Sequence, residues 1–334
     1  DDDFDIISIY DKRNEREVIK SGQKANEIIM YEDLPYSYDA WEVSVYHKDK
    51  KYKIDEVVSY KPISEGARAG FEVVKRFRNS TITQKIYLYN ELDRMDFDTV
   101  VDWHLRHIIV KAAFPVDVNT NKATYEIQFG NIERNHTENT SWDVAKFETC
   151  AHKWADISDN GYGMALMNDC KYGHSVVNDS TIQLSLLRSG NSSSEEVNDQ
   201  GEHIMAYSII PHSGNYIDAD IVRKAYAFNN PMIAREINNS DGESAQSFSL
   251  VNTDSENIII DTVKKAENND NVIFRLYESQ NKKGRAKLKF GVDIKKLYLC
   301  DLLENIEKEI EVKDNTAEID VNNFEIITLM AEVE

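Results

Sequence analysis

The segment 168–173, Asn-Asp-Cys-Lys-Tyr-Gly, combines an amide, a carboxylate, an ammonium group and a phenol. It lies between the apolar run 164–167 and a glycine that suits a turn. Strand alternation would place Asp169 and Lys171 on the same face. Such a pair at a strand end can donate and accept hydrogen bonds to the hydroxyl groups of a sugar. The alternative is an internal salt bridge between Asp169 and Lys171 that holds a hairpin turn.

A second candidate segment contains Tyr38, Asp39 and Trp41. Aromatic faces next to a carboxylate suit the stacking and hydrogen bonding that a pyranose ring requires. Packing of Trp41 in the hydrophobic core is the alternative. The sequence therefore gives Trp41, Asp169 and Lys171 as candidate substrate-binding residues.

We expect no catalytic residue and no metal ligand set in this chain. Hydrolysis of a glycosidic bond with retention needs two carboxyl groups roughly 5–5.5 Å apart, and no motif singles out such a pair. His104 and His107 are three residues apart, so on a strand their imidazoles would point to opposite faces. The remaining histidines of interest are scattered and predicted to be structural: His152, His174, His203 and His212.

The charge of the chain restricts its partners. With 59 acidic and 39 basic residues, the formal charge is −20, which disfavours nucleic acid and anionic membrane surfaces. Neutral sugars are indifferent to this charge. No apolar run is long enough to cross a membrane. The cysteines are three in number, far apart and without a CxxC pair, which fits a reducing cytoplasm better than a disulfide framework.

Period-two alternation predicts an all-β chain. It is clearest at Met95, Phe97, Thr99, Val101 and Trp103. It recurs in three further sets: Ile182, Leu184 and Leu186; Ile204, Ala206, Ser208 and Ile210; and Val272, Phe274 and Leu276. No long segment has a 3.6-residue period, and the turns are rich in Asn and Asp. Many strands without intervening helices favour sheets packed face to face.

A polar run at 238–244 predicts a domain boundary, with one domain over residues 1–240 and a second over 241–334. The chain opens on three aspartates without an initiator methionine and then enters an apolar segment. We therefore expect it to be part of a longer polypeptide.

The most distinctive stretch of the chain lies between Trp142 and Ser189, and further motifs follow in a fixed order on both sides of it. The motifs are Ser141-Trp142-Asp143, 151–156, 168–173, 184–189, 8–12, 38–43, 225–231, 262–267, 275–278, 301–304 and 324–329. Together they resemble the C-terminal region of family 38 glycoside hydrolases, the α-mannosidases of bacterial and cytosolic type. Two departures are Leu105, where the family has Glu, and the segment 133–137, which lacks a proline.

The resemblance implies a large β super-sandwich of the galactose-mutarotase type, followed by a small immunoglobulin-like β-sandwich. It also implies a retaining α-mannosidase that hydrolyses terminal α-mannosyl residues. Its nucleophile, acid/base carboxylate and zinc, or another divalent metal, would lie in an N-terminal catalytic domain outside this chain. In relatives, an aromatic residue from the segment of Trp41 and a basic residue from the region of Lys171 reach the sugar cleft.

The expected partners are thus the catalytic domain of the same polypeptide and a mannose-containing glycan. A homo-oligomer stays open. Two other functions also stay open: a stand-alone lectin-like carbohydrate-binding module, and a mutarotase-like sugar epimerase that uses a histidine acid and a carboxylate base.

Overall fold

The computed structural model describes residues 1–39, 41–177, 180–190, 199–237 and 247–333. The chain divides into two compact units. Unit 1 consists of Asp1–Ile127 and Ile132–Pro231, and unit 2 of Gln128–Asn131 and Met232–Glu334. The expected boundary at 238–244 lies outside the described residues, so the domain limits 1–240 and 241–334 stay a prediction.

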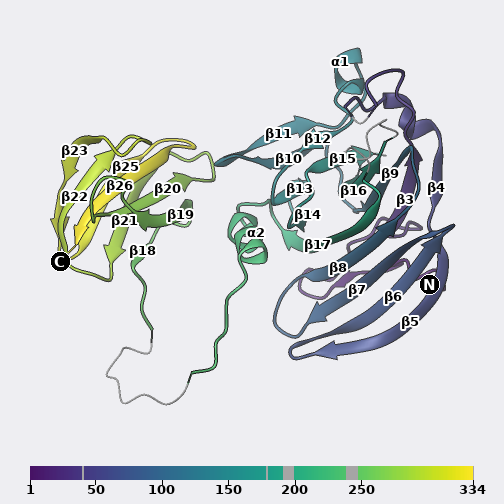
Figure 1. The fold of residues 1–334 in the computed structure, drawn as a ribbon, viewed down its shortest axis with the longest axis horizontal. Helices are drawn as coiled ribbons and strands as arrows, with labels where there is room; N and C mark the ends of the chain where they lie inside the picture. Colours follow the sequence, from purple (N-terminus) through teal and green to yellow (C-terminus); the bar gives the residue numbers. More distant parts are fainter. Residues whose placement is uncertain (40, 178–179, 191–198, 238–246, 334) are drawn as a thin grey trace. The chain divides into compact units, whose positions relative to one another are not determined.

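Unit 1 is built around two large antiparallel sheets (Figure 1). The first has nine strands, in the spatial order β11 (Gly130–Asn135), β10 (Lys122–Ile127), β13 (Trp154–Ser158), β14 (Tyr162–Asn168), β17 (Gly201–Ser213), β8 (Met95–Trp103), β7 (Ser80–Tyr89), β6 (Arg68–Phe77) and β5 (Glu56–Glu65). The second has six, in the order β12 (Thr149–Cys150), β15 (Gly173–Val177), β16 (Thr181–Ser189), β9 (Ile108–Pro115), β3 (Glu27–Glu32) and β4 (Lys51–Lys53). A short pair, β1 (Tyr10–Asp11) and β2 (Arg16–Glu17), precedes them.

The two sheets of unit 1 share one hydrophobic core. Phe97 on β8 stacks on Tyr207 of β17, with ring centroids 4.9 Å apart. Phe114 on β9 meets Phe97 edge-on at 5.6 Å, so aromatic contacts join the nine-stranded to the six-stranded sheet. The buried hydroxyl of Tyr207 donates to Asn26 at 2.7 Å and accepts from Gln84 at 2.6 Å. These bonds satisfy the hydroxyl group, which would destabilise the fold if it were buried without a partner.

The predicted strands are present, but in one of them the side chains that face the core are not those that were predicted. Met95–Trp103 is β8, and Phe97, Thr99, Val101 and Trp103 are all buried. In β17, however, the core shared by the two sheets contains Met205, Tyr207 and Ile209. Of the set 204, 206, 208 and 210 named above, Ser208 and Ile210 are buried outside this core. Ile204 is 72% exposed. Because the side chains on both faces of β17 are largely apolar, hydrophobicity alone could not decide which set faces inward.

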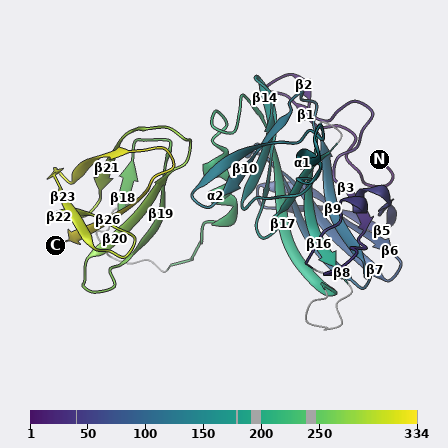
Figure 2. The ribbon, with the colours of Figure 1, turned by 90° about the horizontal axis from the view of Figure 1, so that it is seen from above.

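Unit 2 is a small β-sandwich (Figure 2). Its four-stranded sheet has the order β18 (Val251–Thr253), β21 (Gly284–Phe290), β25 (Thr316–Val321) and β24 (Val312–Lys313). Its five-stranded sheet has the order β19 (Ile258–Lys265), β20 (Val272–Glu278), β26 (Ile326–Val333), β22 (Ile294–Cys300) and β23 (Ile306–Ile310). The sheets share a core in which Phe274 of β20 contacts Phe290 of β21 at 5.3 Å. The expected all-β fold class is confirmed.

Helices are few and short in the described part of the chain. They are the 3-10 helix η1 (Val45–Asp49), α1 (Ser141–Val144) and α2 (Ile221–Asn229), and α2 packs on β14 and β13. Among these residues no helix has both the length and the apolar composition that crossing a bilayer would require.

Candidate functional site

Trp41 lies in the connection 33–50 between β3 and β4, and its side chain is 88% exposed. Its backbone nitrogen donates to the carbonyl of Tyr38 at 2.9 Å, which closes a turn in this connection. Tyr36 and Tyr38 in the same connection are also exposed. The core-packing alternative for Trp41 is therefore wrong. Its contact with sugar stays a prediction.

The connection is held at its start by a buried carboxylate. Asp33 follows β3 and is fully buried, and it accepts a hydrogen bond from Nε of Arg188 on β16 at 2.6 Å. The same guanidinium donates to the backbone carbonyl of Glu42. The connection carrying the exposed aromatic residues is thus attached to the six-stranded sheet on both sides of Trp41.

Asp169 and Lys171 lie in a turn, because β14 ends at Asn168 and β15 begins at Gly173. The alternation that was expected to place them on one face therefore does not apply. Asp169 Oδ1 accepts from the backbone nitrogen of Ala206 on β17 at 3.0 Å, and the nitrogen of Asp169 donates to the Ala206 carbonyl at 3.1 Å.

Lys171 is held through its backbone, since its nitrogen donates to Oδ1 of Asn168 at 2.6 Å. Asp169 and Lys171, both described residues, do not form an ion pair with each other. The turn is instead closed by the bonds of Asp169 to Ala206 and of Lys171 to Asn168, so the alternative of an internal salt bridge is wrong. Between Asp169 and Lys171, partial burial of the sulfur, followed by a hydrogen bond with Asp169 and the charge of that carboxylate, raises the pKa of the Cys170 thiol to about 11, which keeps it protonated. The role of Lys171 toward sugar stays a prediction.

The two candidate segments lie at the same end of the six-stranded sheet. His174 on β15 is aligned through β16 and β9 with Ile28 on β3. Because neighbouring strands are antiparallel, the chain enters β15 and leaves β3 at the same end. Two strands lie between β15 and β3, so these strands are about 14 Å apart across the sheet, which is three strand spacings. Along the strands, the start of β15 is level with Ile28 and Ile29 rather than with the end of β3.

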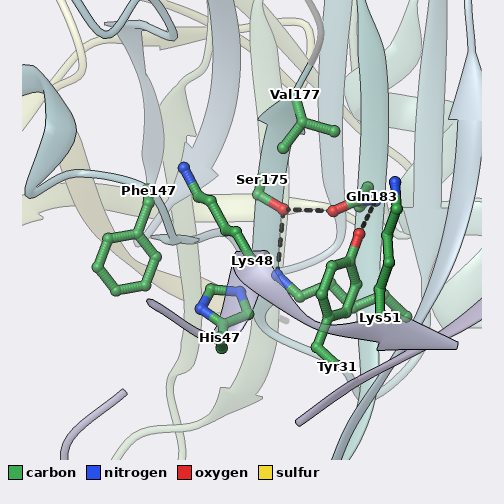
Figure 3. Close-up of a pocket in the computed structure, with 9 residues that line it drawn as sticks. Tyr31, His47, Lys48, Lys51, Phe147, Ser175, Val177 and Gln183 are labelled. Atoms are coloured by element: carbon green, nitrogen blue, oxygen red, sulfur yellow. Dashed lines mark hydrogen bonds between the residues drawn. The ribbon is translucent and has the colours of Figure 1, made fainter. Parts of the chain in front are cut away.

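A polar pocket lies over the outer face of this sheet, beneath η1 (Figure 3). It encloses about 120 Å³. A chain of hydrogen bonds crosses its floor: Lys111 Nζ donates to Ser175 Oγ at 3.2 Å, Ser175 Oγ to Gln183 Oε1 at 3.1 Å, and Gln183 Nε2 to the Tyr31 hydroxyl at 2.9 Å. Figure 3 shows Lys48 and Lys51 extending on either side of this floor.

The charged centre of the pocket is the ion pair between Lys111 and Glu148. The side chain of Lys111 is only 2% exposed, and that of Glu148 is 26% exposed. Ser185 Oγ also donates to Glu148, at 2.6 Å. Burial lowers the pKa of His47 and lowers that of His174 to about 4, so both imidazoles are neutral beside this pair at neutral pH.

This pocket can donate hydrogen bonds, but its geometry does not suit hydrolysis. No carboxylate is among the described residues that line it, and the nearby Glu148 is engaged by Lys111, whereas retaining hydrolysis uses two carboxyl groups. Its volume is also well below the roughly 300–1,000 Å³ typical of small-molecule sites. We conclude that the residues of this polar pocket stabilise the six-stranded sheet by joining its strands, and that the pocket is too small to hold a pyranose ring.

The two histidines considered as a metal pair are not on a strand, because β8 ends at Trp103. The reason given above for their divergence is therefore wrong. They contact different carboxylates: His104 Nε2 lies 2.9 Å from Asp102, and His107 Nδ1 lies 3.9 Å from Asp39.

Three carboxylates do converge in the described residues, at Asp1, Asp3 and Asp5. The ammonium groups of Lys24 and Lys53 contact this group, and Lys75 Nζ lies 2.8 Å from Asp5. Lysines thus neutralise the cluster, which also has no imidazole or thiolate ligand of the kind that zinc prefers. These residues do not fit a zinc site.

Comparisons with known proteins decide the family. The model of the glycosyl hydrolases family 38 C-terminal domain matches residues 2–196, and that of the family 38 C-terminal beta sandwich domain matches residues 257–329. The chain belongs to glycosyl hydrolase family 38. The resemblance found in the sequence is thereby confirmed, and both matching models describe C-terminal domains of the family.

Curated relatives of this family 38 chain are longer than it is. Alpha-mannosidase 2C1 of Homo sapiens is 34% identical over 323 residues, which cover 94% of this chain and 31% of that protein. Alpha-mannosidase G of Dictyostelium discoideum is 34% identical over 343 residues, covering 97% of this chain and 30% of that protein. The chain thus spans about 30% of the length of these relatives.

Solved structures show the same fold. An alpha-mannosidase from Enterococcus faecalis V583 aligns with a TM-score of 0.81 over 99% of this chain and 40% of that chain, at 14% identity. A second family 38 protein from Enterococcus faecalis aligns with a TM-score of 0.78 over 97% of this chain and 42% of that chain, at 15% identity.

The ion pair between Lys111 and Glu148 was not predicted from the sequence. A signal for it was present, because Lys111 is the single charge in the apolar strand Ile108–Pro115. A lone charge in such a strand favours a buried ion pair. Its partner Glu148 is distant in sequence and could not be identified without the fold.

Proposed function

We propose that this chain is the β portion of a retaining α-mannosidase that hydrolyses terminal α-mannosyl residues, and that its partner is the catalytic domain of the same polypeptide. The observation that supports this most directly is family membership combined with the length of the relatives, whose printed names are α-mannosidases and of which the chain spans about 30%. The chain itself then performs no hydrolysis. It forms one side of the sugar cleft.

The end of the six-stranded sheet that carries Trp41 and Lys171 faces that cleft in our proposal. Support comes from the exposed aromatic side chains that gather in the 33–50 connection. Exposed apolar surface concentrated in one segment is typical of a binding surface. Lys171 supplies a cation for a sugar hydroxyl. Asp169 positions the turn through the backbone of Ala206.

The metal belongs to the catalytic domain in this proposal. When bound there, zinc or another divalent metal would grip hydroxyl groups of the sugar. The aspartates at the start of this chain are neutralised by lysines and are not offered as its ligands. We also place the enzyme in the cytoplasm, where exposed thiols such as those of Cys150 and Cys170 stay reduced.

The test is hydrolysis of an aryl α-mannoside by the purified 334-residue chain, with and without added zinc. We expect no release of mannose in either condition, and activity from the full-length polypeptide. Turnover by the chain that is lost when one of its own carboxylates is replaced would show that the catalytic groups have been misplaced. Catalysed exchange of sugar anomers by the chain would instead favour an epimerase.

A further inference from the structure

A large polar cleft lies in unit 1, away from both candidate segments. Its volume is about 1070 Å³, slightly above the range of roughly 300–1,000 Å³ that is typical of ligand sites. Its walls are three turns, 117–121 after β9, 158–161 between β13 and β14, and 214–216 after β17, together with the end of β11.

The cleft and the 33–50 connection lie at opposite ends of β9. The 117–121 turn follows the end of β9 at Pro115, whereas the strand begins at Ile108, opposite Glu32, where the 33–50 connection starts. The strand Ile108–Pro115 spans about 24 Å at 3.4 Å per residue. The sugar units of an oligosaccharide that lie within the cleft would therefore be too far from Trp41 to contact it.

The walls of the cleft are joined by hydrogen bonds. Asp159 Oδ1 accepts from the backbone nitrogens of Gly161 at 2.9 Å and Tyr162 at 3.0 Å. Burial alone would raise the pKa of Asp159, but these two bonds and a third from the backbone of Asn119 outweigh it and lower the pKa. Gly214 donates to the Gly161 carbonyl at 2.9 Å, which connects a third turn. A cleft whose walls are fixed in this way loses little entropy when a ligand binds.

The lining of the cleft is suited to hydroxyl groups. The side-chain amides of Asn119, Asn121 and Asn160 line it, are exposed, and make no hydrogen bond to any other described residue. Each amide offers two donors and an acceptor, so it can bind neighbouring hydroxyl groups of a sugar at once.

The floor of the cleft is a built polar site. Asp156 is 1% exposed; its Oδ2 lies 2.7 Å from Nε2 of His212, and its Oδ1 accepts from Ser158 Oγ at 2.8 Å. Tyr216 lines the cleft and stacks on the buried Trp154, with ring centroids 5.0 Å apart. This stacking fixes the orientation of the Tyr216 ring, which gives the cleft an apolar surface for sugar C–H groups.

The charges around the cleft select a neutral ligand. Asp117, Glu133, Asp156 and Asp159 line it against Lys20 and Lys122, and Lys122 already pairs with Glu133. An anion would therefore be repelled, in a chain that already carries −20. In the described residues, the one group of three converging metal-capable side chains lies elsewhere, at the start of the chain, so these carboxylates do not gather around a cation.

We propose that this cleft, the second cleft, binds a neutral oligosaccharide independently of the sugar cleft proposed above. The bonds that hold the sugar come from the amides of Asn119, Asn121 and Asn160, with Tyr216 beneath its C–H face. The second cleft thereby holds glycan close to the enzyme without taking part in hydrolysis.

The test is calorimetric titration of the 334-residue chain with α-mannotriose. We expect saturable binding that falls at least tenfold in affinity in an Asn119→Ala/Asn160→Ala double variant with an unchanged melting temperature. Asn268→Ala, which removes an exposed amide in unit 2, is the matched control and should bind as the wild type does. Sodium phosphate should not displace the sugar.

Other outcomes would overturn the inference. They are the absence of binding, equal affinity in the double variant, or displacement of the sugar by phosphate. Loss of binding in Trp41→Ala, with retention in the double variant, would move the sugar to the other end of β9 and also overturn it. None of these results depends on hydrolysis, so the failure of the proposed mannosidase function would be seen separately, in the full-length polypeptide.

Discussion

Asp169 holds the backbone nitrogen of Ala206 on β17 at 3.0 Å. It is also bonded to the same residue through the main chain, at 3.1 Å. The turn before β15 is therefore attached to the nine-stranded sheet by Asp169, which leaves the side chain of Lys171 free of a structural ion pair with this carboxylate. The two residues of one motif thus have separable roles.

We first predict different effects for these two residues. Asp169→Ala should lower the free energy of unfolding by about 1 kcal/mol, because an exposed strand nitrogen loses its acceptor. Asp169→Asn keeps an acceptor oxygen and should change stability much less. Lys171→Ala should leave the melting temperature unchanged. In the full-length polypeptide it should lower kcat/KM roughly ten- to a hundredfold, since a charged hydrogen bond contributes about 1.5–3 kcal/mol.

Chemical denaturation of the chain and steady-state kinetics of the full-length polypeptide measure the two effects. Wild-type efficiency in Lys171→Ala would remove this residue from the sugar cleft. A fall in melting temperature with unchanged kinetics would instead give it a structural role.

Trp41→Ala should affect kinetics and not stability. The side chain is 88% exposed, so its removal costs little packing. Loss of stacking on a sugar should cost about 0.5–1.5 kcal/mol, or roughly two- to tenfold in kcat/KM of the full-length polypeptide. Leu303→Ala, which removes a side chain that is 80% exposed in unit 2, is a control for loss of exposed apolar surface. Equal kinetics for the two variants would argue against sugar contact.

The ion pair beneath η1 should be important for stability. Lys111→Met leaves Glu148 without its cation, and we expect a loss of about 2–3 kcal/mol. This is below the cost for a fully buried pair because the side chain of Glu148 retains 26% exposure. The double variant Lys111→Met/Glu148→Gln removes both charges and should be more stable than Lys111→Met alone. Urea unfolding measures both, and a double variant no better than the single one would contradict the charge explanation.

Much of the fold could be predicted from the sequence, because local pattern determines it. Alternation identified β8 from Met95 to Trp103, and the family motifs predicted a large and a small sandwich. The inward face of β17 could not be predicted, since apolar side chains lie on both of its faces and sheet packing selects Tyr207 over Ile204.

The candidate site was predictable only in part. The sequence identified Trp41 and Lys171 by residue type, but their arrangement at one sheet end depends on strand order, which local pattern does not contain. Assuming a strand through Asp169 was wrong because the chain turns after Asn168. The second cleft was missed for the same reason. Asn119, Asn121 and Asn160 are ordinary turn residues in the sequence, and only the fold brings their turns together.

The last prediction concerns the buried imidazole of His174 on β15. Nδ1 of its ring lies 3.2 Å from the carbonyl of Tyr172, and the ring packs edge-on against Tyr125 at 6.5 Å between centroids. Burial lowers its pKa from the ordinary 6.5 to about 4, although the nearby charge of Glu148 acts in the opposite direction. The folded chain therefore holds this imidazole neutral where the unfolded chain would protonate it.

The free energy of unfolding should consequently fall on acidification, between the pKa of His174 in the unfolded chain, 6.5, and that in the folded chain, about 4. The contribution of His174 is fully present above pH 6.5 and is lost as pH falls toward 4, because the unfolded state binds the extra proton in this range. Between pH 7.5 and pH 5 this loss is about 2 kcal/mol. His174→Gln, which keeps an amide donor for the Tyr172 carbonyl, should be less stable at pH 7.5 but should lose less on acidification. Urea unfolding of both proteins at the two pH values measures the difference, and parallel pH profiles would assign the acid sensitivity to other groups.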